Sequence, residues 1–424
     1  MMKRKSPISA LCFLCCNIVT ALFLSSCADF SDVTKEIAAH IQLQLPDELA
    51  STGALAGHTV TMTVGTQRLQ AETDAQGVAT FKGLVPDIYD ISCSWELSAA
   101  DYQQLTGKEL TGGTSCTVSG SANTCLLQTD GQTVTLSTLL SVNQDILISK
   151  IYYAGSAYEG TSRAYTAGQY MELYNQSANP IDVSGLYIGF TETDNPQAYT
   201  LDNLHEAYAD SVLVVKQIFQ IPADSPVMIQ PGGTLLITNS AVDHSDVSQF
   251  EHSLLDADFE AKDSRARIQN NPNTPTLPVI YCSYSNMTYI NFQNTGLMGV
   301  VIFRTNDDNI NDWPLVYPYG KTAGPLFKLL PKRYVIDGVE CLPNKTTTGP
   351  EPSSKRLYSD IDAGYVYINA SNGKSGEVVY RRTARVTDDG RKILADTNNS
   401  SADFQVSTTI KPREYDAAYG LNEK

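Results

Sequence analysis

Hydrophobic and polar residues alternate along most of this chain, which predicts β-strands rather than helices. The runs are short and are bounded by Gly, Pro, Asn or Ser, the pattern of half-buried strands in a sheet. In the first third of the chain they lie at residues 40–45, 58–64, 78–84, 89–95, 115–120, 124–129 and 132–140. Only residues 96–110 have a helical pattern, as a short insertion. Residues 37–144 therefore predict a small β-sandwich.

A second group of strands begins near residue 145. Two apolar-alternating runs, a polar loop, a turn and a third run fill residues 146–190, and we interpret them as the first meander of a second sandwich. The remaining chain is far longer than the about 100 residues of one immunoglobulin-type sandwich. We place the extra length in loop insertions at 201–279 and 306–358. The predicted fold class is all-β, with two immunoglobulin/prealbumin-like β-sandwich domains and an elaborated second domain at 145–424.

The N-terminus has the three parts of a bacterial lipoprotein signal. Basic residues at 3–5 precede a mostly apolar stretch at 8–24, and Leu24-Ser25-Ser26-Cys27 fits a lipoprotein cleavage box. An ordinary signal peptide or a membrane-spanning anchor are the alternatives, although the apolar stretch is short for a span. We predict a signal peptide at 1–26, lipidation of Cys27 and a tether at 27–36. This lipid is the expected membrane anchor.

The charge balance argues against a nucleic-acid partner. The chain has 30 basic and 46 acidic residues, a formal net charge of −16. Removal of the basic signal peptide makes the mature chain more acidic still. Phosphate backbones are bound by clustered positive surfaces, and the mature part contains no basic run.

Five cysteines remain beside the lipidated one: Cys93, Cys116, Cys125, Cys282 and Cys341. An odd number leaves at least one free thiol unless pairing is intermolecular. Cys116 and Cys125 are close enough in sequence for a small disulfide loop. The alternative is that all five are small buried hydrophobic residues.

Two segments resemble known families. The run Thr73-Asp74-Ala75-Gln76-Gly77-Val78-Ala79-Thr80-Phe81, with the later turn at 86–89, resembles prealbumin-like and carboxypeptidase-regulatory-like domains. Such domains are accessory spacers or binding modules. The pattern at 169–190 resembles the lamin-tail type of immunoglobulin-like domain, and the matching residues are Glu172, Asn175, Asp182, Ser184 and Gly185. Pro231-Gly232 before a strand, and the segment 396–404, fit the later elements of that domain.

Residues 146–420 as a whole resemble a Bacteroidetes lipoprotein family, the domain-of-unknown-function family 4876. The runs that carry this resemblance include LLDADFE, IDGVE and LYSDIDAGYVYINASNGKS. The resemblance implies an outer-membrane accessory protein, often one associated with TonB-dependent uptake, and supplies no catalytic residues. Acidic residues just after Cys27 also resemble a surface-export signal of such lipoproteins.

Two clusters carry metal-ligand chemistry, although we expect no cofactor. Imidazole and carboxylate groups suit zinc, and a cluster of them is formed by Asp243, His244, His252, Asp256 and Asp258. The alternative is a solvated acidic loop. Alternating oxygen donors suit calcium, and these are Asp307, Asn309 and Asn311. They lack the glycine and the downstream glutamate of an EF-hand loop, and turns between strands have the same composition.

Aromatic residues in a loop are the best candidates for binding a ligand. Trp313, Tyr317 and Tyr319 lie together, and exposed aromatic rings stack on sugars or anchor protein interfaces. Most of the 23 tyrosines are expected to be structural, because Tyr is a good strand residue. The sequence lacks the nucleophile-elbow, zinc-protease and phosphate-loop motifs.

We therefore expect a non-catalytic protein, lipid-anchored in the outer membrane and facing the cell surface. Its partners would be a TonB-dependent receptor and a small-molecule or glycan ligand bound by loops on a rigid scaffold. An adhesin or surface structural protein is the alternative, and a hydrolase of unrecognised type is a third.

Overall fold

The computed structural model describes residues 35–65, 67–109, 115–142, 144–193, 198–305 and 309–416. The chain divides into two compact units. The first contains Met1–Gln44, Ala54–Cys93 and Gly120–Ser137, and the second contains Leu45–Gly53, Ser94–Ser119 and Thr138–Lys424. We predicted a single boundary at residue 144, whereas the second unit also includes two segments from the N-terminal third.

The first unit is built from short strands, most of them paired antiparallel. Its elements are β1 (Ile37–Gln44), β2 (Thr59–Val64), β3 (Gln67–Glu72), β4 (Val78–Leu84), β7 (Gln132–Ser137) and parts of β5 (Asp87–Ser98) and β6 (Ser115–Leu127). Strand β1 pairs antiparallel with β4 and parallel with β7, while β2 pairs with β3 and β5. Every second residue of β1 is buried, as its alternating sequence predicts.

The predicted turn before β4 is confirmed. Gly77 has φ 79°, a value that glycine adopts without strain, and Asp74 Oδ1 accepts hydrogen bonds from the backbone N–H groups of Gln76 and Val78. Two details of this region differ from the prediction. Strand β3 was not predicted because its sequence is almost wholly polar. The runs at 115–120 and 124–129 belong to one long strand, β6.

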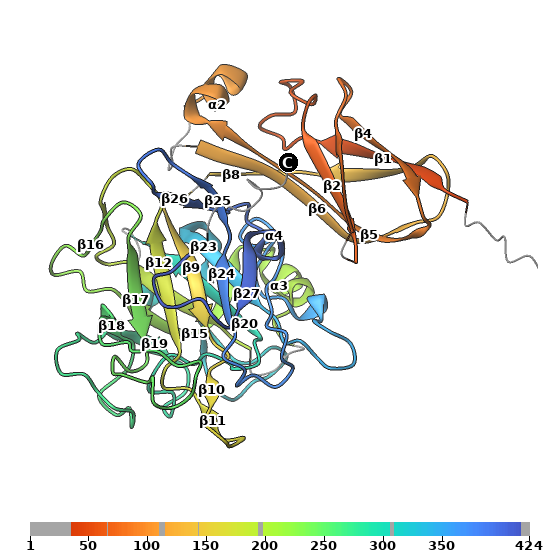
Figure 1. The fold of residues 1–424 in the computed structure, drawn as a ribbon. Helices are drawn as coiled ribbons and strands as arrows, with labels where there is room; N and C mark the ends of the chain where they lie inside the picture. The colour runs from red at the N-terminus through yellow and green to blue at the C-terminus, as the bar shows by residue number, and fades with distance from the viewer. Residues whose placement is uncertain are drawn as a thin grey trace, which may run out of the picture. The chain divides into compact units, whose positions relative to one another are not determined.

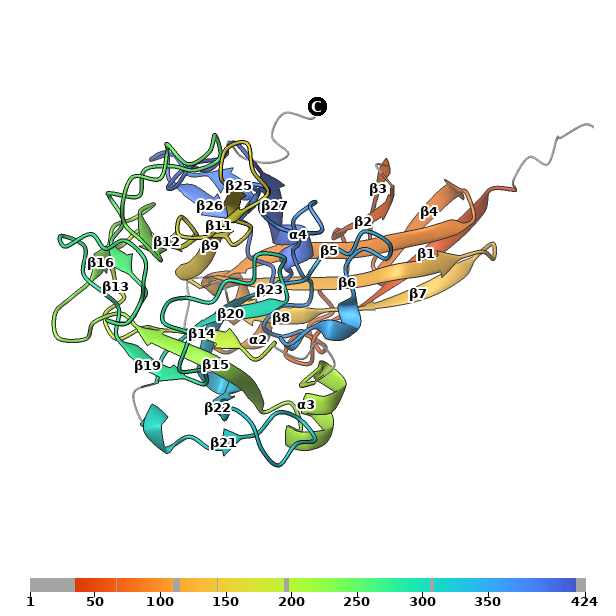
Figure 2. The same ribbon diagram turned by 90° about the horizontal axis from the view of Figure 1, so that it is seen from below.

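The second unit contains two large sheets. The six-stranded sheet has the order β18-β17-β12-β9-β24-β27, and the larger sheet has the order β21-β22-β15-β14-β20-β23, with β19 also paired to β15. Figures 1 and 2 show these strands in two views. The strands of the first sheet are β9 (Ile146–Tyr152), β12 (Tyr170–Asn175), β17 (Thr234–Thr238), β18 (Phe259–Glu260), β24 (Val378–Arg381) and β27 (Phe404–Ser407). Those of the second are β14 (Tyr187–Thr191), β15 (Val212–Gln220), β19 (Val279–Cys282), β20 (Met298–Phe303), β21 (Leu315–Val316), β22 (Phe327–Pro331) and β23 (Val335–Cys341).

Smaller elements complete the second unit. The helices are α2 (Ala99–Thr106), α3 (Leu201–Tyr208) and α4 (Ser400–Asp403), with short 3₁₀ turns η1 (Ile310–Asp312), η2 (Lys332–Tyr334) and η3 (Pro352–Ser354). The remaining strands are β8 (Leu139–Val142), β10 (Ser156–Ala157), β11 (Ala164–Tyr165), β13 (Ile181–Asp182), β16 (Met228–Ile229), β25 (Thr383–Val386) and β26 (Lys392–Leu394). Among the described residues, no helix is both long and apolar enough to span a bilayer.

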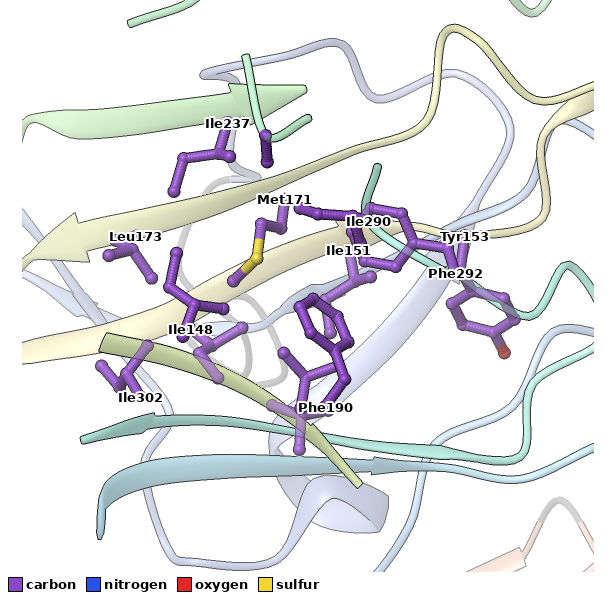
Figure 3. Packing of buried hydrophobic residues seen from close by; sticks show 14 of the residues in the cluster. Ile148, Ile151, Tyr153, Met171, Leu173, Phe190, Ile237, Ile290, Phe292 and Ile302 are labelled. Atoms are coloured by element: carbon purple, nitrogen blue, oxygen red, sulfur yellow. The ribbon is translucent and has the colours of Figure 1, made fainter. Parts of the chain in front are cut away.

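The main core of the second unit combines side chains from both sheets. Met171 and Ile237 from the six-stranded sheet belong to one buried cluster with Phe190 and Ile302 from the other, and Figure 3 shows this packing from close by. A second cluster contains Leu204 of α3 and residues of β15, β20 and β22. The all-β fold class with an elaborated second sandwich is confirmed.

The C-terminal segment and part of one insertion cover the sheet face that a simple sandwich would expose to water. Lys150 donates to the carbonyl oxygens of Lys411 and Glu414, and Tyr152 shares a buried cluster with Leu254. All seven residues of β9 are therefore buried, although their alternation predicted a half-buried strand. The predicted three-strand meander also differs from the structure. β9 and β12 are antiparallel neighbours, but β14 belongs to the other sheet and pairs with β15 and β20.

Residues that carry the lamin-tail resemblance make scaffold contacts. Asn175 Nδ2 donates to the carbonyl oxygens of Asn179 and Ile229, at 2.7 and 2.8 Å. Asp182 Oδ1 accepts from the backbone N–H groups of Ser184 and Val227. These bonds join the turn after β12 to the segment before β17.

All five cysteines of the described chain are free thiols. Cys116 and Cys125 both lie in β6, where nine residues of extended chain separate them by about 30 Å at roughly 3.3 Å per residue. A disulfide joins Cα atoms only about 4.4–6.8 Å apart, so this pair is not bridged. Cys93, Cys116 and Cys341 are buried, as in the alternative interpretation.

Candidate functional site

The aromatic residues predicted to bind a ligand lie in different environments. Trp313 is 6% exposed and stacks on Tyr334, with 5.9 Å between ring centroids. It is a core residue, so the prediction of an exposed binding ring is wrong for Trp313. Tyr317 is 41% exposed, and the half-buried Tyr319 donates a hydrogen bond to Glu206 at 3.2 Å.

The residues predicted to bind zinc are divided among several contacts. Asp243 accepts hydrogen bonds from Ser245 within a turn. Asp256 and Asp258 both form ion pairs with Arg413, at 3.1 and 2.9 Å. In the part of the chain that the structure describes, no group of three His, Cys, Asp or Glu residues could hold a metal ion.

His244 is buried, and its contacts fit a neutral imidazole. Its Nε2 is 2.7 Å from the carbonyl oxygen of Ser240, and its Nδ1 is 2.5 Å from the hydroxyl of Tyr165. A carbonyl oxygen can only accept, so Nε2 carries the proton and Nδ1 accepts from the tyrosine. Burial lowers the pKa of His244, because desolvation disfavours the imidazolium.

This geometry predicts a pH-dependent stability. The folded pKa lies below the unfolded value, so the unfolded chain binds the proton more tightly. The stability from His244 is present above about pH 6.5 and is lost as the pH falls through the folded pKa, at a limiting slope of about 1.4 kcal/mol per pH unit. Between pH 7.5 and 5, the free energy of unfolding should fall less in His244→Gln than in the unmodified protein. Urea denaturation at each pH would measure it.

His205 supplies the control for this measurement. It is an exposed residue whose pKa is raised by Asp210. As the pH falls, the free energy of unfolding of His205→Gln should therefore decrease more than that of the unmodified protein. If the free energy of unfolding depends on pH identically in His244→Gln and in the unmodified protein, the prediction that His244 is buried as a neutral imidazole is wrong.

The predicted calcium ligands and the lipidation site are only partly described. Cys27 and Asp307 lie outside the described residues. Asn309 caps the 3₁₀ turn η1 by accepting a hydrogen bond from the backbone N–H of Asn311. This is a local turn contact, which is the alternative to calcium that the sequence left open.

A cavity of about 800 Å³ lies within the second unit, and its lining includes none of the predicted site residues. We call it the hairpin cleft, because the β25–β26 hairpin forms part of its lining. Its remaining lining comes from the 94–98 and 115–117 segments of β5 and β6, from the turn that follows β12, from residues 144–145 before β9 and from residues 395–397 after β26. The lining residues are Ser94, Trp95, Glu96, Ser98, Ser115, Thr117, Gln144, Asp145, Gln176, Ser177, Ala178, Asn179, Ala384, Arg385, Thr387, Arg391, Ile393, Leu394, Ala395, Asp396 and Thr397.

Gln176 joins the segments that line the cleft. Its side chain donates to the carbonyl oxygen of Gln144 at 2.9 Å and accepts from the backbone N–H of Leu394 at 3.2 Å. Its backbone N–H donates to Asp145, and its carbonyl oxygen accepts from Arg391. The buried Gln176 therefore connects the turn after β12, the residues just before β9 and the β25–β26 hairpin.

The cleft combines one indole ring with polar groups of both charges. Trp95 is half-buried in β5. Glu96 accepts a hydrogen bond from Ser115 at 2.5 Å. Among the described residues, the side chains of Asp145 and Arg385 make no hydrogen bond or ion pair. These two charged groups are available to a ligand.

Asp396 connects the cleft to a buried charge network. It forms an ion pair with Arg381, whose guanidinium also pairs with Asp337 and Asp403 at 2.9 and 3.4 Å. All four side chains are at most 7% exposed. Burial raises the pKa of Asp337 and of Asp403, while the charge of Arg381 opposes that shift. Arg381 therefore forms ion pairs with three carboxyl groups, one of which, that of Asp396, belongs to a residue that lines the cleft.

Two smaller hollows lie elsewhere in the second unit. One of about 420 Å³ is lined by Tyr284, Asn286, Met287, Thr288, Tyr289 and Asn291. The other, of about 330 Å³, is lined by Ser245, Glu251, His252, Ser253, Asp256, Lys411, Pro412 and Glu414. The second hollow brings together His252 and Asp256 of the predicted zinc cluster, but its lining does not include Asp243, His244 or Asp258.

Sequence reasoning missed the hairpin cleft because its parts are far apart in the chain. Trp95 and Asp396 are separated by about 300 residues. Trp95 lies in no recognisable motif, and the lamin-tail resemblance that covers Asp396 does not indicate that the two residues meet. The available signal was composition: Trp95 is one of two tryptophans, and Arg385 and Arg391 flank a turn. Those features alone did not indicate that the segments meet.

Comparisons with known proteins support the family resemblance and the fold. The family model for a protein of unknown function (DUF4876) matches residues 230–411. A crystal structure of a DUF4876 family protein from Bacteroides thetaiotaomicron VPI-5482 has a TM-score of 0.52 and 19% sequence identity, covering 87% of this chain and 94% of that one. The predicted resemblance is confirmed over residues 230–411 and for the all-β fold.

Other comparisons add no functional information. The major pilin subunit BcpA of Bacillus cereus aligns with 72% of this chain and 95% of its own, at 13% identity and a TM-score of 0.15. A likeness at that level supports no argument about fold or function. No curated protein matches the chain.

Proposed function

We propose that this protein is a non-catalytic binding protein of the outer membrane that captures a hydroxyl-rich ligand, such as a glycan, in the hairpin cleft. In this proposal the lipid on Cys27 anchors the chain at the cell surface beside a TonB-dependent receptor. The cleft would hold the ligand close to the transporter that imports it.

The observation that carries this proposal is the composition of the cleft. Ligand sites combine an apolar or aromatic surface with a few polar groups that fix orientation. The ring of Trp95 can stack against the apolar face of a sugar. Asp145 can accept from hydroxyl groups, and Arg385 can donate to hydroxyl or carboxylate oxygens. A cavity of about 800 Å³ is also within the range of small-ligand sites.

The carboxylates of the cleft favour binding over hydrolysis. Glycosidases generally need two carboxyl groups, one that donates a proton and one that acts as base or nucleophile. Asp396 is tied to Arg381 by an ion pair of 3.2 Å, and Glu96 accepts from Ser115. With these two groups occupied, Asp145 is left without a partner carboxyl group in an acid–base role.

The sharpest test measures glycan binding after removal of the indole ring. We expect Trp95→Ala to weaken binding at least tenfold, because truncation of a central aromatic hot-spot residue costs about 2 kcal/mol or more. Isothermal titration calorimetry against neutral and acidic oligosaccharides would measure the affinity, and the melting temperature would verify the fold.

Tyr317→Ala is the matched control. Tyr317 is an exposed aromatic residue outside the cleft, in the loop that the sequence favoured. Its replacement should leave affinity unchanged. Loss of binding in Tyr317→Ala with full binding in Trp95→Ala would move the site to that loop. If the unmodified protein binds none of the oligosaccharides, the proposed function fails.

The membrane part of the proposal has its own test. Affinity capture from membranes with the full lipidated chain should recover a TonB-dependent receptor. A Cys27→Ala chain, which cannot be lipidated at that position, should be released from the membrane and recover less receptor.

A further inference from the structure

The β25–β26 hairpin places two arginines on the lining of the cleft. Arg385 lies in β25, opposite Ile393 of β26. Arg391 precedes β26, and its carbonyl oxygen accepts from the backbone N–H of Thr387, which closes the hairpin. Both residues line the cavity, so the hairpin brings two arginines to one candidate ligand site.

Both guanidinium groups have donor capacity that the protein does not use. Arg391 donates from one terminal nitrogen to Gln176, but its buried Nε has no hydrogen-bond acceptor. The carboxylate of Asp389 is 3.7 Å from that Nε, beyond hydrogen-bond distance. Arg385 is exposed and makes no ion pair among the described residues. The Nε of Arg391 is itself buried, so the donors left for a ligand are the guanidinium group of Arg385 and the terminal nitrogen of Arg391 that does not bind Gln176.

The acidic residues of the cleft do not occupy these donors. Asp396 pairs with Arg381, and Glu96 accepts from Ser115. Asp145 makes no contact with either hairpin arginine within the described chain. Burial raises the pKa of the Asp145 carboxyl group, because desolvation disfavours its charged form.

We propose that the hairpin cleft recognises acidic glycans, with the carboxylate of a uronic-acid-type sugar bound by Arg385 and Arg391. This inference rests on the proposed function and names its ligand class. The planar guanidinium fork matches a carboxylate in two parallel hydrogen bonds, which neutral sugars cannot form. Asp145 accepts from the hydroxyl groups of the same sugar, and Trp95 packs against its ring.

The test compares matched ligands that differ only in charge. A panel of uronic-acid oligosaccharides and their carboxyl-reduced, neutral forms would be titrated into the full mature chain. We expect the acidic forms to bind at least tenfold more tightly, with an advantage that shrinks as salt rises, since salt screens the charge attraction.

Arginine variants assign the preference to the hairpin. Arg385→Gln should reduce the acidic-to-neutral affinity ratio at least threefold, because it weakens binding of the acidic forms more than binding of the neutral forms. Arg391→Gln should also reduce the acidic-to-neutral affinity ratio. Because this variant loses the hydrogen bond between Arg391 and Gln176, the variant of the exposed Arg385 tests the proposal even if Arg391→Gln alters the fold. Arg267→Gln, the same charge change at an exposed residue outside the cleft, should have no effect.

The outcomes separate this inference from the proposed function. Equal binding of acidic and neutral forms would overturn the acidic-glycan inference and leave glycan binding standing. An acidic preference that survives in both hairpin variants would also overturn it. Absence of binding to every member of both sets would contradict the proposed function itself.

Discussion

Replacing Arg381 by leucine is expected to lower the free energy of unfolding by about 3–5 kcal/mol, because breaking a buried ion pair leaves uncompensated charge. Arg381 is 2% exposed and faces the carboxyl groups of Asp337, Asp396 and Asp403. It also donates to the carbonyl oxygens of Ile148 and Ala395, at 2.8 Å each. Its loss therefore removes the only cation of this network within the described residues. Urea denaturation of the mature chain would measure the change.

Two further variants make this result specific. Arg381→Lys keeps the charge but cannot reproduce a planar fork with several simultaneous bonds, so its cost should be intermediate. Arg267→Leu removes an exposed arginine and should change stability by less than about 0.5 kcal/mol. A cost below about 1 kcal/mol for Arg381→Leu would contradict a structural role for the network.

The second large effect is expected at the buried pair of Lys150 and Glu172. Both side chains are 0% exposed, and Lys150 Nζ is 3.4 Å from Glu172 Oε2. Glu172→Leu leaves a buried ammonium group without its counter-charge, at an expected cost of about 3–5 kcal/mol. The same change removes the acceptor for the backbone N–H of Arg413 and for the hydroxyl of Tyr415. The C-terminal segment 411–416 should therefore become more accessible to proteolysis.

A double variant distinguishes charge from packing at this position. Lys150→Met combined with Glu172→Leu replaces both charged groups by apolar ones, so it should recover part of the lost stability. The exposed pair of Lys345 and Glu351 is the control, and its removal should cost less than about 1 kcal/mol.

The same variant tests whether Glu172 has a role in binding. A folded Glu172→Leu chain should keep its affinity for the cleft ligand, because Glu172 does not line the cleft. Normal stability with abolished binding would assign Glu172 to the site instead of the scaffold.

Local patterns predicted the strands of this protein well where burial follows a simple alternation. β1 has alternate buried residues, and the Asp74–Gly77 turn is closed as its residue types require. Prediction failed where the environment was not local. β3 is polar in sequence and is held by its pairing with β2. β9 is buried on both faces because the distant C-terminal segment and the insertion around Leu254 cover its outer face.

The residues predicted to bind a ligand or a metal also show that local sequence gives residue type but not environment. Composition identified Trp313 and Tyr317 as aromatic residues near one another, but it could not distinguish a ring packed on Tyr334 from an exposed ring. Asp256 and Asp258 have the composition of metal ligands, and their pairing with Arg413 depends on a segment about 155 residues away. The sequence gives the type of each side chain. Whether that side chain can bind a ligand depends on the neighbours that it contacts in the folded protein.

The sequence by itself determined the all-β class, the turn chemistry and the resemblance to family 4876, because these follow from residue types a few positions apart. Only the tertiary structure decided which charges are buried, and that the β25–β26 hairpin meets Trp95 and Asp145 in one cleft. Such contacts join residues up to about 300 positions apart, and no local pattern encodes which distant partner will satisfy a given charge. The candidate site is for that reason a property of the folded second unit.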